Sequence, residues 1–249
     1  MNVSTIVLAV AGLLAGMMNS LAGGGSFLTF PALLLAGLDP RAANITSSIA
    51  LFPSQAAAGW AGRGMAAGAA GLSLQMLIIV SLIGGALGAM LLLATPVSFF
   101  THLVPWLILF ATLVFIWGSF FRRKQAKDEK PPISPRVALA LQFAIAVYGG
   151  YFGGGIGFLM LAALTAVGVA VRAAGATKNA LAGIMNVAAV AIFLARSKQN
   201  WVLVLVLGIA AMVGAQIGVV LLRRVPEKIL RLVVSFIGIA LTIGMFLRS

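Results

Sequence analysis

Three consecutive glycines occur twice in this chain, each time inside a long apolar stretch. The motif AGGGS at 22–26 is followed about 131 residues later by FGGGIG at 152–157. Consecutive glycines interrupt a helix. At membrane depth, the freed backbone groups are tolerated only where protein or a water-filled cavity satisfies them. Interrupted helices at corresponding positions of two halves are typical of the substrate site of a membrane transporter.

The composition also indicates a membrane protein. Hydrophobic residues make up 62% of the chain and charged residues 8%, and the mean hydropathy is +1.14. Several apolar stretches reach the roughly 18 residues that span the hydrocarbon core of a bilayer. The net charge of +13 would suggest a nucleic-acid partner in a soluble protein. Here the basic residues lie at helix ends and in one linker, where membrane topology explains them. We therefore expect a lipid bilayer as partner and no nucleic acid.

The sequence predicts an all-α polytopic membrane protein built from two repeats. Shifting the first half by 131 residues pairs Gly37 with Gly168, Arg41 with Arg172 and Thr46 with Thr177. We expect an N-terminal transmembrane repeat at 1–121, a basic cytoplasmic linker at 122–135 and a C-terminal transmembrane repeat at 136–249. Five helical segments are predicted in each repeat: 3–21, 26–37, 43–61, 72–94 and 97–121, then 136–152, 156–169, 173–195, 200–222 and 226–247. The second segment of each repeat is short for a span, which favours a re-entrant or half-depth helix.

The distribution of basic residues predicts that the two repeats have inverted topologies. The turn near Pro226 carries four basic residues, whereas the equivalent turn near Pro96 carries none. Basic residues favour the cytoplasmic side, so the two equivalent turns are expected on opposite faces of the membrane. With the linker inside, this arrangement leaves four of the 17 basic residues outside: Arg41, Arg196, Lys198 and Arg248.

The helices that follow the glycine clusters are candidates for an anion site. Their first amide hydrogens have no intrahelical partner, and the helix dipole adds about half a positive charge. Two such ends facing each other near the membrane midplane bind an anion without a formal charge. Ser26 is placed to cap the first helix, and Tyr148 and Tyr151 are placed to donate hydroxyl groups beside the second cluster. Alternatively, the glycines only allow helices to pack closely.

The third segment of each repeat carries polar side chains at equivalent positions. Ser48 and Gln55 lie seven residues apart, as do Asn179 and Asn186, so each pair shares a helix face. Buried amides are costly in lipid unless paired, so they indicate either substrate contact or hydrogen bonds between helices. Lys178 is the one ammonium well inside an apolar segment, where it either attracts an anion or snorkels to the interface.

Together these arguments give a set of candidate residues. Those predicted to bind substrate are Asn19, Ser20, Gly23, Gly24, Gly25, Ser26, Ser47, Ser48, Gln55, Tyr151, Gly153, Gly154, Gly155, Gly157, Lys178, Asn179 and Asn186. Arg41 and Arg172, where the short segment meets the longer one, are expected either to guard the two mouths of the pathway or to anchor helix ends.

The remaining polar residues argue against other kinds of chemistry. The four carboxylates, Asp39, Asp128, Glu129 and Glu227, all fall in predicted turns or in the linker, and the chain has no cysteine. Proton relays usually run through intramembrane Asp, Glu or His, and cation sites need oxygen ligands. The only histidine, His102, is interpreted as structural. We therefore expect no metal, no cofactor and no enzymatic activity, and a small anion as the cargo.

The glycine motifs resemble a known family. The stretch 16–33, GMMNSLAGGGSFLTFPAL, is similar to the first signature of the sulfite exporter TauE/SafE family, also called the toluene sulfonate uptake permease family. The stretches 149–158 and 176–179 also resemble that family. The resemblance implies a multi-pass protein of the prokaryotic inner membrane that moves sulfur-containing anions such as sulfite, sulfonates and sulfoacetate, in either direction.

The sequence thus predicts a secondary transporter for a small sulfur-containing or organic anion, working by alternating access. One alternative is a passive channel for an anion or small solute. Another is a membrane module that scaffolds a partner without transport. The substrate, the direction, the coupling ion and the oligomeric state, a homodimer included, are left open.

Overall fold

The computed structural model describes residues 3–21, 24–117, 133–221 and 227–247. Gly23 and linker residues 122–132 therefore lie outside the described residues. Within the described ranges the chain forms ten α-helices and one short 3₁₀ helix: α1 (Val3–Leu21), α2 (Ser26–Leu35), α3 (Pro40–Gly62), η1 (Arg63–Met65), α4 (Leu74–Ala94), α5 (Val97–Ile116), α6 (Pro135–Tyr151), α7 (Ile156–Ala166), α8 (Val171–Arg196), α9 (Trp201–Leu221) and α10 (Glu227–Phe246). The predicted all-α fold, with five helical segments in each half, is confirmed.

Several helices are long and apolar enough to cross a membrane. These are α4, α5, residues Ala173–Arg196 of α8 and residues Trp201–Gly218 of α9, whereas α2, α7 and residues Thr5–Ser20 of α1 are shorter apolar helices. Large apolar side chains such as Ile83, Phe110 and Ile209 are exposed on the outside of the bundle. An exposed apolar surface of this kind suits lipid rather than water. The chain is a multi-pass membrane protein.

Local sequence signals explain where the third helix begins. The helix α3 starts at Pro40, three residues earlier than predicted, because Asp39 is its N-cap. The Asp39 carboxylate accepts the N–H groups of Arg41 and Ala42, both at 3.0 Å. Proline at the first helical position adds to this start signal, since its missing N–H would have no partner there.

The short helices α2 and α7 end in the same way. Each stops before a glycine in the left-handed region, Gly37 with φ +92° and Gly168 with φ +85°. In both, the residue after the glycine donates its N–H back into the last turn: Leu38 to the Leu33 carbonyl and Val169 to the Leu164 carbonyl, each at 3.1 Å. These helices are therefore two and three residues shorter than predicted, because this closing turn belongs to the connection.

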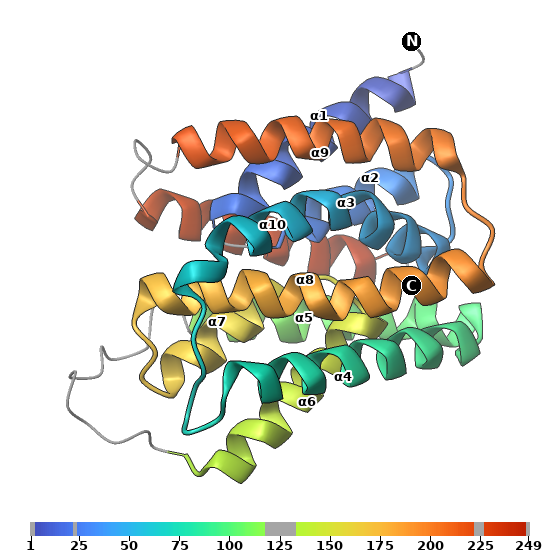
Figure 1. Ribbon diagram of the computed structural model, residues 1–249. Coiled ribbons are helices and arrows are strands. Elements are labelled where there is room, and N and C mark those ends of the chain that lie inside the picture. Colours follow the sequence, from blue (N-terminus) through green and yellow to red (C-terminus); the bar gives the residue numbers. More distant parts are fainter. Residues whose placement is uncertain (1–2, 22–23, 118–132, 222–226, 248–249) are drawn as a thin grey trace.

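The helices pack in pairs that match when the two halves are exchanged. The packing of α1 on α9 corresponds to that of α6 on α4, and α3 on α9 corresponds to α8 on α4. In the same way, α2 packs on α3 as α7 packs on α8, and α5 packs on α7 as α10 packs on α2. Figure 1 shows the resulting bundle, in which α8 lies beside α4. This correspondence is what a duplicated chain would produce.

Small residues set the closest helix contacts. A Cβ atom added to Gly16 would lie 1.9 Å from the Ala211 carbonyl oxygen, and one added to Gly88 would lie 2.1 Å from the Val147 carbonyl oxygen. Close helix packing is therefore one established role of glycine in this chain. The glycine clusters at 23–25 and 153–155 have another role, described below.

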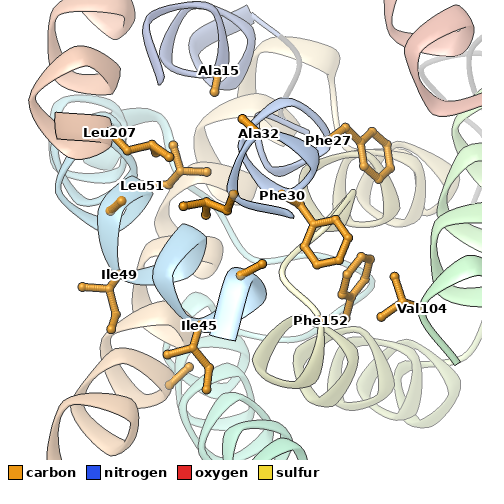
Figure 2. Packing of buried hydrophobic residues seen from close by; sticks show 14 of the residues in the cluster. Ala15, Phe27, Phe30, Ala32, Ile45, Ile49, Leu51, Val104, Phe152 and Leu207 are labelled. Atoms are coloured by element: carbon orange, nitrogen blue, oxygen red, sulfur yellow. The ribbon is translucent and has the colours of Figure 1, made fainter. Parts of the chain in front are cut away.

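The main hydrophobic core surrounds the interrupted segments and draws on both halves. Phe27 and Phe158, which occupy equivalent positions in the repeats, are buried with ring centroids 6.1 Å apart. Phe30 and Phe152 meet edge to face at 5.9 Å, and their rings are seen side by side in Figure 2. Close packing of these rings fixes the two interrupted segments against each other.

Candidate functional site

The two glycine breaks meet in the interior of the protein. Gly24 and Gly155, equivalent residues of the repeats, have φ values of +84° and +76°, a left-handed conformation that favours glycine. The Ser26 hydroxyl donates to the Gly153 carbonyl at 3.3 Å, and a Cβ added to Gly155 would lie 3.1 Å from the Phe27 ring. The interrupted helices and their mutual approach are as predicted.

A small central cavity lies at this meeting point. Its volume is about 30 Å³, enough for roughly one water molecule. The predicted site residues that line it are Asn19, Ser20, Gly24, Ser26, Gln55, Gly153, Gly157, Lys178 and Asn179. Both helices that follow the glycine breaks contribute their first turns. Their unpaired amide hydrogens and dipoles therefore lie beside this cavity.

Five lining residues were not predicted: Ser54, Ala58, Ile156, Ala182 and Ala215. Two of them follow from helix periodicity, since Ala58 lies one turn from Gln55 and Ala182 lies one turn from Lys178. Ala215 has no such signal in the sequence. It enters through the contact of α1 with α9, where its carbonyl accepts the Ser20 hydroxyl at 3.0 Å.

Asn19, in the wall of the cavity, carries an unpaired donor. Its Oδ1 atom accepts the Gly25 N–H at 2.8 Å, which leaves Nδ2 as the other end of the amide. Among the described residues, Nδ2 is buried and has no hydrogen-bond partner. The prediction that Ser26 caps α2 is wrong, because the N-cap is Gly25, which makes no side-chain capping bond. The Gly25 N–H is instead bonded to the side chain of Asn19. A buried unpaired N–H group is costly unless a ligand accepts it.

Lys178 brings a positive charge to the same cavity. It lies about two turns into α8 and is only 5% exposed. Among the described residues its ammonium has no hydrogen bond and no ion pair; Asp39, the one carboxylate with a described side chain, caps the distant start of α3. This burial does not fit a lysine that reaches for the interface. A buried ammonium without a partner is expensive, and an anion in the cavity would compensate it.

The remaining polar residues of α3 and α8 make helix contacts. Asn186 donates through Nδ2 to the Oε1 atom of Gln55, its equivalent in the first repeat. Thus hydrogen bonding between helices accounts for Asn186, which does not line the cavity. Ser47 pairs with Thr29 at 2.6 Å, and Ser48 donates to the Asn44 carbonyl at 2.9 Å, so neither serine is directed into the cavity.

The tyrosines near the second break support the fold. The Tyr151 hydroxyl donates to Thr95 Oγ1 at 3.3 Å, outside the cavity. Tyr148 donates to the Gly154 carbonyl at 3.0 Å. Gly25, Gly154 and Gly155 shape the backbone of the breaks without lining the cavity.

Other predicted roles can be placed as well. The ring nitrogen Nδ1 of His102 is bonded to the Ser98 carbonyl one turn earlier, at 2.7 Å, in agreement with a structural role. Among the described residues, no group of three or more His, Cys, Asp or Glu side chains could hold a metal. The side chain of Arg172 lies outside the described residues.

A second, larger cavity opens at the other end of α3 and α8. We call it the vestibule: its volume is about 860 Å³, and it is lined by Asp39, Arg41, Ala42, Ile45, Thr46, Met90, Leu93, Ala191, Ile192, Ala195, Arg196, Ser197, Lys198 and Gln199. Arg41, predicted to stand at a pathway mouth, lies in its wall. Its Nη1 atom donates to the Thr95 carbonyl at 2.9 Å, which ties the start of α3 to the α4–α5 turn.

Comparison with known proteins identifies the fold family. The family described as sulfite exporter TauE/SafE matches residues 8–245. The chain belongs to the sulfite exporter TauE/SafE family. It is 32% identical over 239 residues to the probable membrane transporter protein ORF9 of a Sinorhizobium species, which covers 94% of this chain and 89% of that protein. A probable membrane transporter protein of Haemophilus influenzae is 27% identical over 242 residues, covering 96% and 93%.

A third relative gives the same result. The probable membrane transporter protein YfcA of Escherichia coli is 27% identical over 230 residues, covering 90% of this chain and 83% of that protein. As a member of the TauE/SafE family, the chain is a membrane transporter. The central cavity and the vestibule are two places in the described structure where its cargo can be sought.

Proposed function

We propose that this protein is a secondary transporter that moves a small sulfur-containing or organic anion across the prokaryotic inner membrane by alternating access. The single observation that carries the proposal is Lys178, an ammonium 5% exposed and unpaired among the described residues, at a cavity lined by two interrupted segments. Anions are the ligands that such a site stabilises best, because helix N-termini and an ammonium act in the same direction.

The donors around the cavity fit a sulfite or sulfonate group. Such a group presents several acceptor oxygens, and a sulfonate carries no donor at neutral pH. The free Nδ2 of Asn19, the amide of Asn179 and the first-turn N–H groups beside Gly157 supply donors. The family name supports the same substrate class. A carboxylate has the same acceptors, so small organic anions belong to the proposal too.

The packing of α3 and α8 supports alternating access. The two helices run antiparallel: Gly59 faces Asn179 and Gly62 faces Ala176, while their other ends diverge around the vestibule. One end is thus closed and the other open. A central cavity of about 30 Å³ must widen to admit an anion larger than water. Inverted repeats achieve this by movement of one helix group against the other.

The proposal extends to sidedness and driving force. The basic residues predict that the vestibule faces away from the cytoplasm, with Arg63 and the linker on the cytoplasmic side. An interior-negative membrane drives anions outward by about 2.3 kcal/mol per charge per 100 mV. Export therefore needs no coupled ion, whereas concentrative uptake does.

Exchange of labelled anion in proteoliposomes tests the proposal. Vesicles loaded with unlabelled sulfite, sulfoacetate or ethanesulfonate would take up the same labelled compound, with the membrane potential clamped. We expect saturable exchange whose apparent affinity for the anion is lower in Lys178→Met. If only neutral or cationic compounds move, the anion assignment is wrong.

A passive channel is the second candidate. Its flux would rise without saturation and would show no acceleration by substrate on the opposite side. The close packing of α3 on α8 at Gly59 and Gly62 favours the transporter, because an open pore needs a water path past this contact.

A further inference from the structure

The vestibule is chemically different from the rest of the apolar bundle. We propose that it is a second anion site, an antechamber that concentrates small anions, dianions above monoanions, and delivers them to the central cavity. The delivery step rests on the proposed transport function; the concentration of anions does not.

Three cations from two parts of the chain converge on this cavity. Arg41 comes from the first turn of α3, Arg196 from the last turn of α8, and Lys198 from the turn that follows. The single acid in the wall, Asp39, accepts two backbone N–H groups as the N-cap of α3. Among the described residues no ion pair neutralises any of the three. The three cations and one acid therefore give the vestibule a net positive formal charge.

The position of these cations matters as much as their number. Basic residues at helix ends commonly anchor a protein in the membrane interface, and Arg196 also suits the negative end of the α8 dipole. An anchor, however, belongs on the lipid-facing surface, and these three residues line a cavity of about 860 Å³.

The vestibule walls strengthen the field of these charges. Ile45, Met90, Leu93, Ala191 and Ile192 make much of the wall apolar. A cleft lined by one sign of charge with low-dielectric walls focuses the field and raises the local concentration of counter-ions by about 10- to 1000-fold. A positive vestibule of this kind enriches anions from the bulk solution.

The charge of the anion decides how strongly it is enriched. The enrichment follows a Boltzmann factor in which charge multiplies potential, so a dianion is enriched by the square of the factor for a monoanion. A compound with a sulfonate and a carboxylate gains more than a simple sulfonate of similar size. The vestibule thus selects for charge before the central cavity selects for shape.

The potential in the vestibule can be measured without knowing the substrate. The chain contains no cysteine, so Ala191→Cys places a single thiol in the wall. Its rate of modification is compared for two thiosulfonates of similar size, one with a sulfonate (2-sulfonatoethyl methanethiosulfonate) and one with a quaternary ammonium. Ser98→Cys, an exposed position in α5 outside the vestibule, is the control.

We expect the thiol of the Ala191→Cys protein to favour the anionic reagent, relative to the thiol of the Ser98→Cys protein, by about 10-fold or more at low salt. Adding Arg196→Gln and Lys198→Gln should abolish this preference, whereas Arg63→Gln at the opposite end should not. Salt at about 1 M, where the Debye length is about 3 Å, should reduce it. Equal preference at both thiols, or a preference unchanged by the two substitutions, would overturn the proposal.

Transport kinetics test the delivery step. Sulfoacetate and ethanesulfonate differ mainly by a carboxylate in place of a methyl group. Both are used as competitors of anion exchange. The apparent affinity of each should be lower in the Arg196→Gln, Lys198→Gln protein, and the factor for sulfoacetate should be roughly the square of the factor for ethanesulfonate. An equal loss of apparent affinity for the two competitors, or no loss, refutes the antechamber. Absence of any anion exchange in the unmodified protein refutes the proposed function instead and leaves the thiol measurement standing.

Discussion

Replacing Lys178 tests most directly whether this residue binds the transported anion or only supports the fold. We expect Lys178→Met to stabilise the protein while weakening anion binding. Methionine has a similar length and keeps the apolar contacts of the side chain, but it carries no charge. The reason is that the ammonium is 5% exposed and has no partner among the described residues, so the fold tolerates it without gaining from it.

The size of both effects follows from this geometry. Removing a buried charge that lacks a partner should stabilise the fold by about 1–4 kcal/mol, the range found when buried ion pairs are replaced by apolar side chains. A hydrogen bond to a charged group contributes about 1.5–3 kcal/mol, so anion affinity should fall by about 10- to 150-fold.

Thermal unfolding in detergent and anion exchange in proteoliposomes measure the two effects. A saturating anion should raise the unfolding temperature of the unmodified protein, since at about 100 times its Kd a ligand adds about 2.7 kcal/mol. At the same anion concentration this gain should fall to about 0.3–1.4 kcal/mol in Lys178→Met, because the affinity is lower. Arg136→Met, an exposed basic residue at the start of α6, is the control and should change neither quantity. Lower stability with normal exchange would show that Lys178 is a structural residue, and the argument for the anion site would fail.

Three further predictions concern the breaks and the closed end. Asn19→Asp keeps the acceptor for Gly25 but adds a negative charge, at about 4 kcal/mol of repulsion for an anion about 4 Å away; anion exchange should be lost in a folded protein, and normal exchange would contradict the site. Gly155→Ala should lower the unfolding temperature more than Gly168→Ala: both have positive φ, but the added Cβ lies 2.6 Å from Ala111 in the first and meets open space in the second, and equal shifts would deny the crowding. A Gly62→Cys, Ala176→Cys pair, with Cβ atoms about 3.5 Å apart, should form a disulfide that stops exchange until it is reduced; unchanged exchange would show that this end need not open.

The interrupted segments could be predicted from sequence because their chemistry is local. Three glycines in an apolar stretch leave few alternatives to a break, and finding the motif twice at one spacing indicates that both breaks serve one site. Gly24 and Gly155 indeed share the same left-handed conformation. The unpaired amides of the helices that follow are then a necessary consequence of the break.

The lining of the cavity could be predicted only in part, because the sequence treats the two repeats as equal and the structure does not. Ser47 and Ser48 are the counterparts of Lys178 and Asn179, and all four were expected at the site. Only the α8 pair lines the cavity; the α3 contribution comes from Gln55 and its neighbours, two turns further along. Which copy faces the cavity depends on how α3 packs against α8, and nothing local to either sequence encodes that.

The same difference in packing between equivalent residues of the two repeats accounts for the vestibule. Thr46 and Thr177 are equivalent and both are buried, yet Thr46 lies in the vestibule wall, whereas Thr177 is bonded to the N–H and carbonyl of Ala67 at 2.9 and 3.2 Å. Residues 63–73, which include η1, fill the closed end, while only 197–200 join α8 to α9 beside the open one. Related sequences therefore adopt two different packings within one molecule, and such packings need differ by only a few kcal/mol. An anion that binds one packing better than the other by a similar amount is sufficient to exchange them, which gives a duplicated chain with a single central cavity a direct physical route from binding to transport.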